Sequence, residues 1–166
     1  MAKQDAFIIS HWHHLLENYS ESSQNFYSQL EQATKQKNIP DIKVSRIDYR
    51  EGGIFSAKRE YLRVKRKGLL FDICAAPFGN SFFISWWLGE KMGPFLSLLL
   101  LIPGIGAWII KTFRPETYYR TDTTLMYQEL VHSAVLELLD CITKDKGLRA
   151  LSELERKPIL RSLMGK

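Results

Sequence analysis

Residues 58–88 read KREYLRVKRKGLLFDICAAPFGNSFFISWWL, and this stretch indicates the fold class. Its first half alternates apolar Leu62 and Val64 with basic residues, as a strand with one buried face does. Lys67-Gly68 suits a two-residue turn, so the stretch predicts an antiparallel β-hairpin. On the return strand we expect Leu69, Phe71, Ile73 and Ala75 to point inward, and Leu70, Asp72 and Cys74 to point outward.

The flanking sequence extends this hairpin into a meander. Residues 43–50, KVSRIDYR, have the period of a strand and precede the turn-forming residues EGG. Residues 77–80, PFGN, predict a second turn before the β-forming run SFFISWWL. We therefore expect three to four antiparallel strands, and helices packed on them would make the fold class α+β.

The N-terminal part has a different period. From Ile8 to Ala33 the apolar residues recur every three or four positions, which predicts an amphipathic helix or a pair of helices. The serine-rich run YSESSQN at residues 19–25 argues against a single unbroken helix, because serine and asparagine side chains compete for backbone hydrogen bonds. We expect this helical element to end before Pro40 and to cover one face of the sheet.

The C-terminal part has the clearest helical pattern of the chain. Paired apolar residues recur from Asp122 to Ile142, and the lysines at 144 and 146 suit the negative end of a helix dipole. The tail offers a capping box from Ser152 to Glu155, and Pro158 interrupts the Leu-rich pattern of the tail. We therefore expect one long helix and a short, kinked tail helix.

Between these parts lies an apolar segment, Met92–Ile110, with the sequence MGPFLSLLLLIPGIGAWII. It has nineteen uncharged residues, the length of a bilayer span, and its Leu, Ile and Phe side chains favour insertion. The alternative is a helical hairpin buried in a soluble oligomer. We expect a helix-plus-sheet domain at 1–91, a transmembrane or re-entrant segment at 92–110, and a helical region at 111–166 that packs on the sheet or on a partner. The residues expected in lipid include Phe95, Leu99, Leu100, Pro103 and Trp108.

The signals for membrane topology conflict. Bases are more numerous after the segment (Lys111, Arg114 and Arg120) than before it (Lys91), which would export the N-terminal domain. The N-terminus has no signal-peptide pattern. A re-entrant insertion bent at Pro103 would keep both sides cytoplasmic, provided that neighbouring protein satisfies the interrupted backbone. Aromatic residues expected at the headgroups are Trp86, Trp87, Trp108, Tyr118 and Tyr119.

Composition narrows the class of partner. The chain has 166 residues, a net charge of +5 and a pI near 9.2, which favours lipid headgroups, nucleic acid or a phosphorylated ligand. Its two cysteines, Cys74 and Cys141, lack the spacing of a metal site or a disulfide framework. We therefore expect a reducing compartment.

A basic run in the hairpin is the candidate binding site. On a strand, Arg59, Arg63 and Lys65 project from one face and can bind the phosphates of lipid or nucleic acid. The alternative is a solvated strand whose charge prevents aggregation. The nearby apolar segment favours lipid, and the absence of an RNA- or DNA-binding motif makes nucleic acid less expected. The complete candidate set is Arg59, Arg63, Lys65, Arg66 and Lys67.

No catalytic signature is found in the sequence. His11, His13 and His14 lack the spacing of a metal site, and His132 falls on the polar border of the predicted long helix. Glycines 104 and 106 lie inside the apolar run rather than in a phosphate-binding loop. We expect no enzymatic activity, no metal and no cofactor.

The wide apolar stripe of the long helix predicts an interface, formed by Met126, Leu130, Ala134 and Leu138. The function expected from these features is a membrane-anchored, non-enzymatic interaction subunit, or an effector that perturbs the bilayer by oligomerising at the cytoplasmic membrane face. The alternative is a soluble basic module that binds a nucleotide or nucleic acid, with its apolar segment buried in an oligomer.

Overall fold

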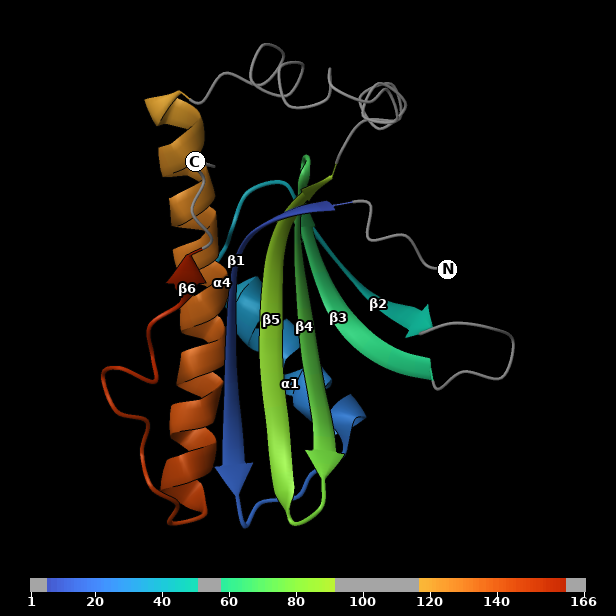
Figure 1. Ribbon diagram of the computed structural model, residues 1–166, viewed down its shortest axis with the longest axis vertical. Helices are drawn as coiled ribbons and strands as arrows, with labels where there is room; N and C mark the ends of the chain where they lie inside the picture. Colours follow the sequence, from blue (N-terminus) through green and yellow to red (C-terminus); the bar gives the residue numbers. More distant parts are fainter. Residues whose placement is uncertain (1–5, 51–57, 92–116, 161–166) are drawn as a thin grey trace, which may run out of the picture.

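A computed structural model describes residues 6–50, 58–91 and 117–160 of the chain (Figure 1). In these ranges an α+β fold combines a six-stranded antiparallel sheet with two helices. The elements are β1 (Ala6–Glu17), α1 (Ser23–Gln36), β2 (Ile42–Arg50), β3 (Lys58–Arg66), β4 (Leu69–Phe78), β5 (Ser81–Lys91), α4 (Tyr118–Asp145) and β6 (Ile159–Leu160).

The predicted meander is confirmed. The strand order is β2-β3-β4-β5-β1-β6, so β2 to β5 follow one another along the chain and across the sheet. The turn between β3 and β4 is Lys67-Gly68, and Lys67 adopts a φ of 51°. The next turn is Gly79-Asn80, where Gly79 has a φ of 61°, a conformation that glycine adopts without steric cost.

The N-terminal helix predicted from Ile8 to Ala33 is not confirmed. Ala6–Glu17 is not helical but forms β1, which pairs with β5 along its whole length. Its most buried apolar residues, Trp12 and Leu16, are four positions apart, and this spacing puts two residues on one face of either a helix or a strand. A helix follows β1 instead: α1 begins after Ser22, whose hydroxyl accepts a hydrogen bond from the Asn25 amide at 3.1 Å.

The two faces of the sheet have different surroundings. Both helices lie on one side, which we call the inner face, and neither covers the other side, the open face (Figure 1). The alternate residues that the hairpin pattern predicted to point inward lie on the inner face, together with residues of β1 and β5, and all are buried against α1 and α4. Its largest members are Trp12, Leu62, Phe71, Ile73, Phe82, Ile84, Trp86 and Leu88.

The long C-terminal helix is confirmed as α4, and its contacts correct the position of His132. This side chain is only 2% exposed, between α4 and the sheet, and not on a polar border. Trp86 Nε1 donates to His132 Nδ1 at 3.0 Å, so Nε2 carries the proton and donates to the Arg156 carbonyl at 2.7 Å. Burial lowers the pKa of His132, which keeps the ring neutral.

The predicted tail helix is not confirmed, because residues 148–160 contain turns and the short strand β6. The capping box does form: the Ser152 amide donates to the Glu155 carboxylate at 2.7 Å, and the Glu155 amide to Ser152 Oγ at 3.4 Å. Two tertiary contacts compete with a helix, since Trp12 Nε1 donates to the Glu155 carbonyl and β6 pairs with β1. Pro158 has no amide hydrogen with which to continue a helix.

The predicted membrane segment, Met92–Ile110, lies outside the described residues. Among the helices that the structure does describe, none has both the length and the apolar composition needed to cross a bilayer. Trp86, expected at the headgroups, is instead fully buried in the core, which corrects that prediction.

Candidate anion-binding surface

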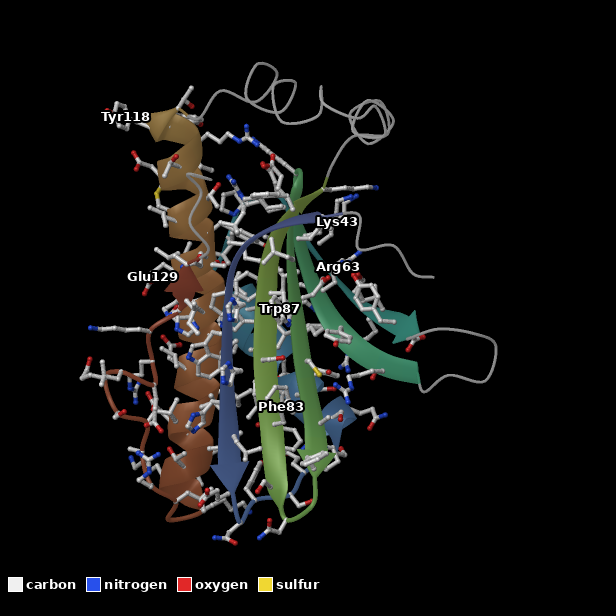
Figure 2. The ribbon with its side chains drawn as sticks, in the orientation of Figure 1. Lys43, Arg63, Phe83, Trp87, Tyr118 and Glu129 are labelled. Atoms are coloured by element: carbon white, nitrogen blue, oxygen red, sulfur yellow. The ribbon has the colours of Figure 1, made fainter. Side chains whose placement is uncertain are left out.

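The sheet register brings side chains from five strands together on the open face. One row across the sheet runs His11, Trp87, Asp72, Arg63 and Ser45. Asp72 is outward-facing, as predicted, and Figure 2 shows Arg63 and Trp87 on this side. Along this row the open face is therefore polar and aromatic, where the inner face is apolar.

Two lysines lie directly opposite each other on this face. Lys43 of β2 and Lys65 of β3 are register partners, and both are exposed. Like charges in this arrangement are destabilising, so the fold gains nothing from the pair. An anion placed between the two ammonium groups would remove the repulsion. Lys43 was absent from the predicted set, because only the register places it beside Lys65.

Arg63 is part of an internal network and is not a free cation. Its Nε donates to Asp72 Oδ1 at 2.6 Å and one terminal nitrogen donates to Asp72 Oδ2 at 2.7 Å. Tyr49 donates to the same carboxylate at 3.0 Å, and burial together with Asp72 raises the pKa of Tyr49 to about 12. The predicted basic stripe is thus interrupted at Arg63, whose charge Asp72 neutralises.

Arg59, at the other end of the stripe, lies close to Tyr61 and Cys74. Burial raises the pKa of the Cys74 thiol, although Arg59 opposes part of this effect. A neutral, buried thiol is a poor nucleophile. In this part of the open face the side chains therefore pack against one another and offer no reactive group.

The other basic residues of the candidate set lie at one end of the domain, together with Lys43 and Lys91. We call this end the basic end. Lys43 and Lys65 lie there with the turn after β3, and the Lys91 amide donates to the Gly68 carbonyl at 2.8 Å, which places the end of β5 beside this turn. Asp41 and Glu90 are acids of the same end, but the bases outnumber them. The members of the basic end are Lys43, Lys65, Arg66, Lys67 and Lys91.

The end of β5 and the start of α4 lie at the same end of the domain. β5 ends at Lys91, and Thr117 is the N-cap of α4. An ion pair between Arg120 of α4 and Glu90 of β5 holds the two sites together, and Figure 1 shows the start of α4 and the end of β5 at the same end of the molecule. Lys91 and Thr117, the described residues nearest to 92–116 in the sequence, therefore both lie at the basic end.

Aromatic and imidazole rings line the other half of the open face. His11 stacks on Trp87 with ring centroids 4.8 Å apart, and His13 stacks on Phe83 at 6.4 Å. Trp87 remains 39% exposed. This arrangement offers a flat apolar surface next to the Arg63 network. The sequence showed these residue types but not their alignment across β1 and β5.

Of the four residues predicted to form an interface on the long helix, two are exposed and two are buried. Met126 and Leu130 are exposed on α4, at 59% and 38%. Ala134 and Leu138 are buried in the protein's own core, where they pack on residues of the same chain. The apolar stripe of α4 is wide because this helix packs on both α1 and the sheet.

Within the described ranges, no cluster of three or more His, Cys, Asp or Glu side chains could hold a metal ion. No protein-family model matches the chain, and no curated protein or solved structure matches it.

Proposed function

We propose that this protein is a membrane-anchored, non-enzymatic interaction subunit that rests on the cytoplasmic membrane face with its basic end toward anionic lipid. One observation carries the proposal: the stretch that contains Met92–Ile110 joins the domain at both of its ends beside the basic end. Insertion of this segment would bring the lysines of the basic end to the headgroups. Exposed Met126 and Leu130 are then available for oligomerisation, as an effector acting on the bilayer requires.

The packing of β5 against α4 restricts how the segment can insert. Trp86 of β5 and His132 of α4 share a hydrogen bond in the core, so both elements must lie on the same side of the membrane. A single crossing would separate them. Insertion from one side, with the bend at Pro103-Gly104 inside the bilayer, satisfies this condition. It also removes the conflict between the excess of bases after the segment, which would export the N-terminal domain, and the N-terminus, which has no signal-peptide pattern.

The test compares two pairs of lysines in the full chain. Lys43→Gln/Lys65→Gln removes two charges from the basic end, and Lys144→Gln/Lys146→Gln removes two exposed charges from the far end of α4. Each lysine near an anionic leaflet contributes about 1 kcal/mol, so the first variant should lose about thirtyfold in partitioning to phosphatidylserine vesicles at low salt. The control should partition like the wild type, and neither change should affect neutral vesicles.

Insertion is measured separately, by pelleting membranes after an alkaline carbonate wash. The full chain should stay with the membrane, and both lysine variants should stay with it too. Monodisperse full-length protein purified without detergent would contradict the anchor. Equal losses in the two lysine variants would contradict the orientation.

A second candidate function rests on the exposed Trp87 and the half-buried Phe83, on the same face as the Arg63 network. Bases of single-stranded nucleic acid stack on such rings with about 1–3 kcal/mol each, and Lys43 and Lys65 would hold the phosphates. The expected signature is salt-dependent RNA binding that falls in Trp87→Ala, together with release of the protein from membranes by carbonate. This result would replace the membrane proposal.

A further inference from the structure

Lys43 of β2 and Lys65 of β3, which we call the lysine pair, lie directly opposite each other on the open face. Both are exposed, and no ion pair within the described ranges includes either of them. Residues in this relation have Cβ atoms about 4.5–5.5 Å apart, so the two charged side chains start from neighbouring positions. Figure 2 shows Lys43 nearer the basic end than Arg63.

Arginines of the same two strands differ from the lysine pair, because the protein itself supplies their partners. Arg63 donates two hydrogen bonds to Asp72, and the Arg46 guanidinium lies 3.8 Å from the Glu60 carboxylate. Asp41 precedes β2, but no ion pair of the described ranges joins it to the lysine pair. The lysine pair therefore keeps its two charges for a ligand.

We propose that the lysine pair binds one phosphomonoester, either the terminal phosphate of a lipid headgroup or that of a soluble ligand. A phosphomonoester has a charge of about −1.5 to −2 at pH 7 and three strong acceptor oxygens. Each ammonium group can donate to a different oxygen of the same phosphate, at about 2.7–2.9 Å. A phosphodiester or a carboxylate has a single charge, so it neutralises only one of the two lysines.

The place of the lysine pair in the domain favours a lipid as the source of the phosphate. Lys43 and Lys65 belong to the basic end, where Lys91 and Thr117 also lie. An apolar segment inserted from this end would bring the lysine pair to the headgroups, where the phosphate of a phosphomonoester lipid is exposed. The choice of a lipid rests on the proposed membrane function, and the phosphate chemistry does not.

A relocated lysine separates a specific site from net charge. Lys43→Gln/Ser45→Lys keeps the charge of the open face but moves one ammonium group two residues along β2, away from the position opposite Lys65. A phosphate held by both lysines requires them to be opposite, whereas diffuse attraction depends on the number of charges near the membrane. Lys144→Gln/Lys146→Gln is the control, and circular dichroism checks the fold of each variant.

The first probe is a phosphatidylcholine vesicle that contains either phosphatidic acid, a phosphomonoester, or phosphatidylserine, at matched surface potential. At neutral pH and low salt, the full chain should partition about tenfold more to phosphatidic acid, the effect of one additional hydrogen bond to a charged group. The control should keep this ratio, and Lys43→Gln/Ser45→Lys should reduce it to about one. Lys65→Gln should reduce it as well. An unchanged ratio in the relocated variant would overturn the proposal.

The second probe is glycerol phosphate, a soluble phosphomonoester, with binding to the full chain measured by calorimetry. Saturable binding that Lys43→Gln/Ser45→Lys abolishes, without a preference between the two vesicles, would support the site and assign it a soluble ligand. Equal partitioning to both vesicles together with no binding of glycerol phosphate would overturn the proposal. The membrane proposal would then still stand, because its own tests are partitioning to phosphatidylserine and retention after the carbonate wash.

Discussion

Trp86 and Trp87 are neighbours in the sequence and lie on opposite faces of the same sheet. Trp86 is fully buried on the inner face, where its indole N–H is bonded to His132. Trp87 stacks on His11 and remains 39% exposed on the open face. Stability and surface chemistry are thus separated in this protein. The inner face holds the fold together, and the open face is available for binding.

The largest effect is expected from truncating each tryptophan in turn. Trp86→Ala leaves a large cavity and an unpaired His132, so we expect a loss of about 3–5 kcal/mol in the free energy of unfolding. Trp87→Ala should lose no more than about 1.5 kcal/mol, the size of an aromatic pair. Urea unfolding of both variants in one buffer measures the difference. Similar losses would show that the open face is also part of the core.

A smaller effect is expected from the polar network of the open face. Asp72→Ala removes the acceptor for Arg63 and Tyr49 and should cost about 1–3 kcal/mol, because the half-buried guanidinium loses its partner. Asp72→Ala/Arg63→Met should recover most of this loss, since neither charge remains. If the double variant is as unstable as the single one, the network contributes through packing and not through charge.

The smallest effect concerns pH and the inner face. Burial lowers the pKa of His132, so below about pH 6.5 the unfolded chain binds a proton that the folded protein excludes. Stability should therefore fall as the pH decreases from about 7.5 to about 5. His132→Gln, which does not titrate, should show a shallower decline in the urea midpoint. His14, whose pKa burial also lowers, should account for part of the remaining slope. An unchanged slope would place the titrating group elsewhere.

Local patterns were sufficient for much of this fold. The hairpin of β3 and β4 and the turn before β5 followed from strict alternation around turn residues. The long helix α4 followed from paired apolar residues. β1 was missed because residues four positions apart lie on one face in both a helix and a strand. The pairing with β5, which the sequence does not show, makes this segment a strand. The capping box formed at Ser152 without a helix because contacts with β1 bind that segment instead.

The candidate surface was harder to predict, because it depends on register. Alternation correctly placed Arg59, Arg63 and Lys65 on one face, but it could not show that Asp72 neutralises Arg63 or that Lys43 lies opposite Lys65. Likewise it could not separate Ala134 and Leu138, which the core buries, from Met126 and Leu130.

The fold class, the turns and the net positive charge are properties of the sequence alone, because they depend on neighbouring residues and on composition. Tertiary contacts were needed to establish which charges are neutralised and which face the helices leave open. They also bring Lys91 and Thr117 to one end of the domain. The physical reason is that ion pairing and burial depend on residues far apart in the chain, and the sheet register brings those residues together.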